Sequence, residues 1–441
     1  MKNRLLLVVF SVVCLVALLM PGCTQETTAP APTPPPAEEK PVVEVLTASI
    51  CAFSGPASAI HGITAAAWKD YFKYMQEKDG PICGKNGCVK VNYTGCDSEY
   101  KADKAKQCFS KLVPEGLIAH THYASAHSDH LMIDYEAAKI PLVTGSMGVA
   151  SAFSEWAYGT IYSGVVNLSR SFATWRKDVW EKEGKTGTLK IGFLGVDEPY
   201  VPLGFFKIAD WCEKNSTDEI KMEAYVEIFP PAATDCTAQA LRLKDAGVES
   251  IYILSTAAHG PMEAKSVRRA GIDPTVTPVA FATCCLLEDC CVLGGNEVME
   301  NFLGEYWTIP LGHGPDIPEP EGLTVAKACW ERWHKGEGVM PSGYYQGVTT
   351  ATVMEAALKL ALDEVSPEEI TGETLKIHGL DRIRDFDKKG TCRPFSYDEP
   401  GKNLGPDQVS YWRVNDGKLS NYSGWIEATT ERVSMKELTG K

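Results

Sequence analysis

The strongest constraint on the fold of this 441-residue chain is a regular alternation of short apolar runs with longer amphipathic stretches. Short apolar runs predict buried strands, and amphipathic stretches predict helices. Strands are expected at residues 42–50, 89–94, 117–120 and 141–143, then at 189–195, 222–228, 250–254 and 278–282. Helices are expected between them, at residues 57–78, 101–112, 204–214, 237–246 and 262–270, with one more ending near residue 139. This order predicts two successive α/β units, each with a parallel sheet covered by helices on both faces.

The rest of the chain adds two helices, at residues 325–334 and 344–363, and two strands, at 409–414 and near Trp425. A chain of this length is too long for one core and predicts two or three domains. Its hydrophobic and charged fractions, 44% and 23%, are ordinary for a soluble globular protein. The net charge of -14 argues against a nucleic acid as partner, because phosphate binding needs a basic surface.

The N-terminus has the layout of a secretory signal. Lys2 and Arg4 are basic, residues 5–20 are apolar, and Pro21, Gly22 and Cys23 follow. This end resembles the bacterial lipobox, in which the cysteine is lipidated, although Met20 stands where leucine is usual. We expect residues 1–22 to be a lipoprotein signal peptide and Cys23 to carry the lipid. The alternatives are a plain signal peptide cut nearby and an uncleaved anchor.

Residues 23–41 form a tether rich in proline, alanine and threonine, a composition that stays extended and solvated. Such a tether would hold the folded body off a membrane surface. We therefore expect a protein that is lipid-anchored to the cell membrane and faces the periplasm or the outside. Cys23→Ala is expected to release it into the soluble fraction.

The loops after the strands are where function is expected, because ligands of open parallel sheets bind beyond the carboxyl ends of the strands. Three such loops contain Ser54-Gly55-Pro56, the turn at 197–200, and the run Pro-Ala-Ala-Thr-Asp at 231–235. In this order they resemble the branched-chain amino-acid-type solute-binding proteins of ABC importers, which are type I periplasmic binding proteins. The resemblance extends from residue 42 to the last strand.

The resemblance implies two Rossmann-like lobes joined by a hinge of three chain segments. Lobe 1 would hold residues 42–163 and 309–388, and lobe 2 would hold residues 164–308 and 389–430. A small solute would bind between the lobes and close the hinge, and an ABC permease would read the closed form. The resemblance implies a protein that is not an enzyme, needs no cofactor and is a monomer.

The family's ligand contacts fall on particular positions of this chain. Ser125 falls at the carboxylate-binding serine, Ser146 in a segment of backbone contacts, and Tyr200 at the tyrosine that covers the ligand. His61 falls where a large residue closes the pocket. The full set of expected ligand-binding residues is Ser54, His61, Tyr123, Ser125, Thr144, Ser146, Tyr200, Thr256 and Thr283.

Two positions depart from the family. Thr283 stands where amino-acid-binding members have an acidic residue for the ammonium group, and Thr256 stands where an aromatic residue is frequent. A buried ammonium needs a paired charge. The expected solute is therefore a small carboxylate, either an amino acid or an aromatic or other organic acid.

Four histidines, at positions 120, 122, 127 and 130, lie close together in the sequence. They could form a transition-metal site, a pocket for an anion, or ordinary hydrogen-bonded and surface side chains. The chain has no H-E-x-x-H motif, so we predict no metal site.

Thirteen of the fifteen cysteines lie in the body of the chain, which suits an oxidising compartment and leaves at least one unpaired. Cys83 and Cys88 flank a turn and could close a hairpin, and Cys96 and Cys108 flank the start of a helix. The adjacent pairs at 284–285 and 290–291 are predicted to form disulfides, with metal binding or a reactive thiol as alternatives.

Two other functions stay open from the sequence. The same two-lobed body could report a ligand to a membrane receptor. A metal-dependent hydrolase using the histidines and cysteines is the third possibility, but no nucleophile elbow, P-loop or dinucleotide fingerprint is present.

Overall fold

The computed structural model describes residues 40–54, 58–198, 200–397 and 403–432. The signal peptide, the lipidation site at Cys23 and the tether up to residue 39 lie outside these residues. Within the described part of the chain, no helix combines the length and the apolar character needed to cross a membrane.

The first sheet has six strands in the order β2-β3-β1-β4-β5-β6, and all neighbours are parallel except β2 and β3. Its strands are β1 (Val42–Cys51), β2 (Ile82–Cys83), β3 (Cys88–Asp97), β4 (Leu117–Thr121), β5 (Leu142–Thr144) and β6 (Ala157–Gly159). Its helices are α2 (Ser58–Asp79), α3 (Ala102–Leu112), α4 (Ser125–His130), α5 (Met132–Ala138), α13 (Glu321–Trp333), α14 (Ser342–Glu364) and α15 (Gly372–His378). We call this sheet with its helices lobe 1.

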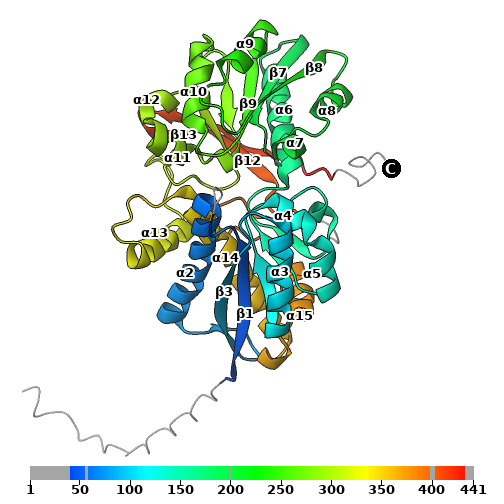
Figure 1. Cartoon of the computed structure of the whole chain (residues 1–441), viewed down its shortest axis with the longest axis vertical. Coiled ribbons are helices and arrows are strands. Elements are labelled where there is room, and N and C mark those ends of the chain that lie inside the picture. Colours follow the sequence, from blue (N-terminus) through cyan, green and yellow to red (C-terminus); the bar gives the residue numbers. More distant parts are fainter. Residues whose placement is uncertain (1–39, 55–57, 199, 398–402, 433–441) are drawn as a thin grey trace, which may run out of the picture. The chain divides into compact units, whose positions relative to one another are not determined.

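Two hydrophobic cores cover the two faces of this sheet. Successive side chains of a strand point to opposite faces, so Val45 of β1 joins the core under α2, α13 and α14, whereas Ala48 and Ile50 join the core under α3 and α5. Figure 1 shows α2 and α3 on opposite sides of β1 and β3. Lobe 1 is therefore the helix-covered α/β unit that the first half of the sequence predicts.

The second sheet has seven strands in the order β13-β12-β11-β10-β9-β7-β8. Its strands are β7 (Gly187–Val196), β8 (Ile220–Phe229), β9 (Ser250–Leu254), β10 (Val279–Phe281), β11 (Leu303–Tyr306), β12 (Gln408–Asn415) and β13 (Lys418–Glu427). The first five are parallel, and β12 and β13 add an antiparallel edge. Its helices are α6 (Val165–Lys182), α7 (Tyr200–Gly204), α8 (Ile208–Lys214), α9 (Thr237–Asp245), α10 (Gly260–Arg269), α11 (Leu287–Gly294) and α12 (Asn296–Met299). We call this unit lobe 2.

The predicted fold class is confirmed, but several elements differ from the prediction. The prediction missed β6, α6, α11, α12, β11 and α15, and the helix expected to end near residue 139 is two helices, α4 and α5. The helix expected at 204–214 is also two helices, α7 and α8. They are separated because Lys207 has a left-handed backbone with a φ of 48°.

The chain passes between the lobes three times. The first passage lies between β6 and α6, the second between β11 and α13, and the third before β12. The third passage lies later in the chain than the lobe boundary expected at residue 388. Beyond that boundary, four side chains still lie in the cores of lobe 1: Cys392, Phe395, Tyr397 and Leu404. We therefore propose that the third passage lies at residues 404–408.

Hydrogen bonds join the passages to one another. The buried ammonium of Lys388 donates to the carbonyl of Thr160 at 2.7 Å, and the backbone N–H of Ile309 donates to the carbonyl of Thr391 at 2.7 Å. Gly159 N–H donates to the carbonyl of Asn403 at 2.8 Å. These bonds tie the chain at the first and second passages to residues 388–403, the segment that leads into the third passage.

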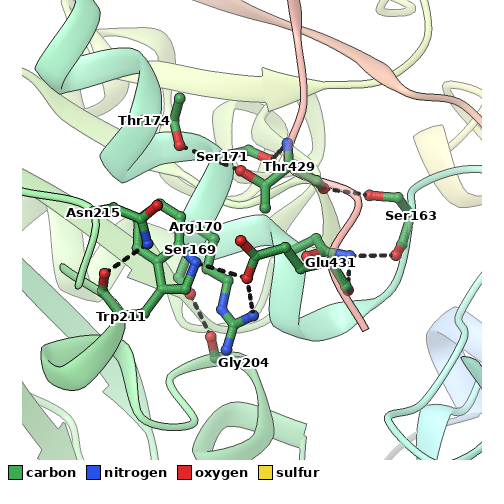
Figure 2. A network of polar contacts seen from close by, with 11 residues as sticks. Ser163, Ser169, Arg170, Ser171, Thr174, Gly204, Trp211, Asn215, Thr429 and Glu431 are labelled. Atoms are coloured by element: carbon green, nitrogen blue, oxygen red, sulfur yellow. Dashed lines mark hydrogen bonds and ion pairs between the residues drawn. The ribbon is translucent and has the colours of Figure 1, made fainter. Parts of the chain in front are cut away.

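The segment after β13 runs along α6 of lobe 2, as Figure 2 shows. The carboxylate of Glu431 accepts hydrogen bonds from Arg170 and Trp211, each at 2.8 Å. Ser163, in the first passage, donates to the carbonyl of Thr429 at 3.0 Å. Arg432 donates to the side chain of Asn403 at 3.1 Å, so this segment contacts both α6 and the third passage.

Two disulfides, Cys83–Cys88 and Cys96–Cys108, are present, at the two places where the sequence predicts them. The prediction of disulfides at 284–285 and 290–291 is wrong for this structure, where these four cysteines are reduced.

Candidate functional site

The predicted site residues lie at the carboxyl ends of the strands in both sheets. In lobe 1, Tyr123 and Ser125 follow β4, and Thr144 and Ser146 end and follow β5. In lobe 2, Tyr200 begins α7 after β7, Thr256 follows β9, and Thr283 follows β10. Parallel strands place these loops along one edge of each sheet.

Hydrogen bonds fix most of the lobe 1 side chains. Thr144 Oγ1 donates to the carbonyl of His122 at 2.7 Å and accepts from the backbone N–H of Ser146 at 3.0 Å. The hydroxyl of Ser146 lies 2.8 Å from that of Tyr162 in the first passage. Tyr123 donates to the side chain of Gln346 in α14. Ser125 is buried as the first residue of α4.

Four ring side chains form a continuous row in lobe 1. His61 contacts Tyr100 with ring centroids 5.0 Å apart, Tyr100 contacts His127 at 5.6 Å, and His127 contacts His122 at 6.0 Å. Burial is the main cause that lowers the pKa of each of these histidines, to about 4 for His61 and His127 and well below its usual range for His122. The row is therefore uncharged at neutral pH.

Both ring nitrogens of His122 and of His120 are buried and make no hydrogen bond to any described residue. In the described residues, no group of three or more histidine, cysteine, aspartate or glutamate side chains is arranged to hold a metal ion. The row thus offers neutral donors and acceptors rather than a preformed metal site.

Lobe 2 contributes a tyrosine and a carboxyl group. The hydroxyl of Tyr200 is buried and makes no hydrogen bond to a described residue. The backbone N–H of Thr283 donates to the carboxyl of Glu305 at 3.4 Å, and the hydroxyl of Tyr252 donates to it at 2.7 Å. Burial raises the pKa of Glu305 to about 8. The carboxyl group beside Thr283 is thus mostly protonated at neutral pH.

Side chains of the two lobes meet at this edge. Tyr123 packs against the hydrophobic core of lobe 2. Burial, and after it the proximity of Tyr162 and Cys284, raises the pKa of Tyr123. Burial and then Cys284 also raise the pKa of Tyr200. Cys284 therefore lies beside tyrosines from lobe 1, from the hinge and from lobe 2.

Two predicted residues are not brought to this group by any described contact. Ser54 is exposed and donates to the carboxylate of Asp97 at 2.6 Å. Thr256 Oγ1 lies 3.1 Å from the Nδ1 atom of His259, whose other nitrogen lies 3.1 Å from the carbonyl of Pro231.

The sequence prediction missed Tyr100, Tyr162 and Glu305. Tyr100 follows β3, and its left-handed backbone, with a φ of 59°, turns the chain there. Its place in a loop after a strand is a signal that could have identified it. Tyr162 could have been found only from its position at the lobe boundary, and no sequence signal marks Glu305.

A small hollow lies within lobe 1, beside this group. Its walls include Cys51, Thr121, His122, Tyr123 and Gly145, and its volume is about 10 Å³. This is about the space that one water molecule needs. Larger hollows of about 370 and 540 Å³ open on lobe 2 and contain none of the predicted site residues.

Comparison with known proteins identifies the family. Residues 47–392 match a family model described as periplasmic binding protein. No curated protein sequence matches the chain significantly.

Among solved structures, a branched-chain amino acid ABC transporter protein from Thermus thermophilus with bound valine is 17% identical. It aligns with 92% of this chain and 100% of its own, with a TM-score of 0.68. An ABC transporter substrate-binding protein from Aeropyrum pernix is 18% identical over 88% of this chain and 97% of its own, with a TM-score of 0.72. A fatty acid ABC transporter substrate-binding protein from Thermomonospora curvata is 13% identical over 91% and 96%, with a TM-score of 0.68. At these identities the likeness concerns the fold.

Proposed function

Because the chain belongs to the periplasmic binding protein family, we propose that it captures a small carboxylate-bearing solute between its two lobes and delivers it to an ABC permease. The observation that carries this proposal is the set of buried polar atoms without partners on both sides of the interlobe edge: both ring nitrogens of His122 and the hydroxyl of Tyr200. A buried polar group without a partner costs about 1–3 kcal/mol. A solute that bonds to both residues would remove this cost and hold the lobes together.

The groups available suit an organic acid better than an amino acid. A neutral imidazole and a tyrosine hydroxyl can each donate one hydrogen bond to a carboxylate. The carboxyl group of Glu305 accepts a hydrogen bond from the backbone of Thr283, the position expected to hold an ammonium group, and burial raises its pKa to about 8. A mostly protonated carboxyl group supplies little counter-charge for an ammonium ion. We therefore propose an aromatic or other organic acid, with amino acids as the comparison class.

Entry of the solute requires the hinge. Side chains of the two lobes already meet at this edge, where Tyr123 packs against the core of lobe 2, and three chain passages form a pivot on which the lobes can rotate. Ligand-driven closure then produces one defined surface for a permease. The names of the structural neighbours, one with valine and one for fatty acids, are consistent with a fold that accepts different cargoes.

A thermal-shift screen against aromatic acids, aliphatic acids and amino acids tests the proposal, since a ligand that binds only the folded chain raises its melting temperature. Tyr200→Phe removes one hydroxyl and should weaken the best ligand about 10- to 100-fold, the loss of a hydrogen bond to a charged group. Tyr225→Phe is the matched control, because that hydroxyl bonds to Glu223 at 2.8 Å on the exposed part of β8. Equal affinities for the two variants would refute the site.

We further propose that Cys23 anchors the protein to the membrane as a lipoprotein. The support is the sequence of residues 1–23 and the tether that follows it. The same sequence supports a location outside the cytoplasmic membrane, and membership of the periplasmic binding protein family supports action as a monomer next to its permease.

A further inference from the structure

Nine cysteines are reduced in the described residues, and seven of them are buried. The two that are partly exposed, Cys284 and Cys291, each stand next to another cysteine, Cys285 and Cys290. Buried thiols are inert towards dissolved oxidants, whereas partly exposed ones can react. These two adjacent pairs are therefore the places where thiol chemistry can begin.

The two pairs differ in how their sulfur atoms lie. In the short 3-10 helix η3 (Thr283–Cys285), both thiols donate to the same carbonyl oxygen, that of Ser255, at 3.5 Å from Cys284 and 3.2 Å from Cys285. Their sulfur atoms therefore lie next to each other. Cys290 and Cys291 are consecutive residues inside α11, where neighbouring side chains do not face each other.

Hydrogen bonds distinguish Cys285 from Cys284. The backbone N–H of Ser255 donates to the sulfur of Cys285 at 3.3 Å, and the hydroxyl of Ser255 lies 3.6 Å from it. Burial opposes ionisation of Cys285, but the hydrogen bonds from Cys284 and Ser255 outweigh it and lower its pKa. The hydrogen bond to Cys285, and then burial, raises the pKa of Cys284. Of the two thiols, Cys285 is therefore the more acidic.

We propose that Cys284 and Cys285 form a redox-active dithiol, which low-molecular-weight disulfides oxidise to a disulfide between the two adjacent residues. Cys284, the partly exposed member, gives up its proton and attacks the external disulfide, forming a mixed disulfide and releasing one thiolate of the oxidant, which takes up that proton. Cys285 then attacks the sulfur of Cys284 and displaces the second thiol. Two protein thiols lose two hydrogens in total, and the external disulfide is reduced to two thiols.

The backbone makes this bond reversible. Adjacent Cα atoms are about 3.8 Å apart, which is shorter than the usual separation across a disulfide, and such strain makes the bond easier to reduce. Cys96–Cys108 joins Cα atoms 5.7 Å apart, within the usual range. A mild reductant should therefore reopen the 284–285 bond before Cys96–Cys108.

The pair lies close enough to the candidate site for its oxidation to affect the site. Cys284 is close enough to Tyr123, Tyr162 and Tyr200 to raise the pKa of each, after burial. Oxidation removes a donor from this group and moves a side chain between the lobes. An effect on solute affinity rests on the proposed function, whereas the thiol reaction itself does not.

The test uses the full chain without solute, incubated with oxidised glutathione, alkylated, cleaved and mapped by mass spectrometry. Cleavage after Glu288 separates the two pairs. We expect the peptide that contains residues 284–285 to lose two hydrogens and the peptide with residues 290–291 to be alkylated. Cys285→Ser should instead accumulate glutathione on Cys284, because the displacing thiol is absent, and Cys291→Ser should behave as the natural chain.

A second measurement needs no variant. Alkylation of the natural chain with N-ethylmaleimide under native conditions should label Cys284 and prevent the loss of two hydrogens. A stable glutathione adduct on Cys284 of the natural chain, a bond between Cys285 and Cys290, or no oxidation under conditions that keep Cys96–Cys108 intact would each overturn the proposal. Because solute is absent throughout, failure here would leave the proposed function standing.

Discussion

At the scale of single residues, the buried carboxyl group of Glu305 makes stability depend on pH. Burial raises its pKa from an ordinary 4.5 to about 8, so between these values the folded state holds more protons than the unfolded state. The contribution of Glu305 to folding stability must then fall as pH rises through this window, by about 1.4 kcal/mol per pH unit at most. Glu305→Gln should keep the hydrogen bond from Tyr252 and flatten the fall between pH 5 and 8.

Urea unfolding at pH 5, 6, 7 and 8 measures this slope. Glu223→Gln, at an exposed position of β8, is the control and should leave the slope of the natural chain unchanged. An unchanged slope in the Glu305 variant would show that its carboxyl group is not protonated in the folded state.

His120 predicts the opposite dependence of stability on pH, on the acid side. Burial lowers its pKa from an ordinary 6.5 to about 3, so the folded state holds fewer protons than the unfolded state between these values. The contribution of His120 to stability must fall as pH drops below 6.5. His120→Leu is close in volume and removes two buried nitrogen atoms that have no partner in the described residues.

We expect this variant to be within about 1 kcal/mol of the natural chain at pH 8 and to lose less stability between pH 6.5 and 4. Guanidinium unfolding at pH 4, 5, 6 and 8 measures the difference. The exposed His130, changed to leucine, is the control. A parallel loss for both variants on the acid side would contradict the role of burial at His120.

At the scale of elements, the segment after β13 is held to α6 by one carboxylate. Glu431 bonds to the buried guanidinium of Arg170 and to the indole N–H of Trp211 (Figure 2). Removing one partner of a buried ion pair costs 3–5 kcal/mol, but Glu431 is 44% exposed, so we expect Glu431→Gln to lose about 1–3 kcal/mol. Chemical denaturation measures this loss.

Glu427→Gln, at the exposed end of β13, is the comparison and should change stability by less than about 0.5 kcal/mol. Hydrogen exchange of the α6 amides adds a local measurement, because release of the segment should speed exchange there first. Loss of stability in both variants alike would remove any special role for Glu431.

The elements also show how far sequence reasoning reaches. The strands β1, β4, β7 and β9 were predicted within two residues of their ends, because continuous apolar runs identify strands that are buried on both faces. Helix α6 was missed although Leu168, Phe172, Trp175 and Val179 recur at helical spacing and pack in the lobe 2 core. Strand β11 carried no such signal, since it has four residues and a buried glutamate.

In the candidate site, too, some features can be found from the sequence and others only from the structure. Loops after strands could be found from the sequence, and in the structure Ser125, Ser146 and Tyr200 each follow the carboxyl end of a strand. The partners that those loops meet come from distant parts of the chain, as Gln346 does for Tyr123. Sequence spacing holds no information on such pairs, so Tyr162 and Glu305 became visible only in three dimensions.

At the scale of the whole molecule, the hinge depends on a close approach of two glycines. A Cβ atom on Gly405, in the third passage, would lie 2.4 Å from the carbonyl oxygen of Gly159, and one on Gly159 would lie 2.1 Å from that of Leu404. The first and third passages therefore touch backbone to backbone. A side chain at either position must push the passages apart and so change how one lobe sits on the other.

Gly405→Ala tests this contact, and Gly424→Ala is its matched control. Both glycines have a positive φ, 94° and 69°, so an alanine strains the backbone at each, by about 1–2 kcal/mol. Only Gly405 has neighbours within 4 Å of the added Cβ atom. We expect Gly405→Ala to lose at least about 1 kcal/mol more in urea unfolding than Gly424→Ala, because overpacking adds to the backbone strain.

Small-angle scattering should also show a larger radius of gyration for Gly405→Ala than for the natural chain and for Gly424→Ala. Equal stability losses with equal radii would mean that the two passages are free to separate, and the hinge would then have to be placed elsewhere in the chain.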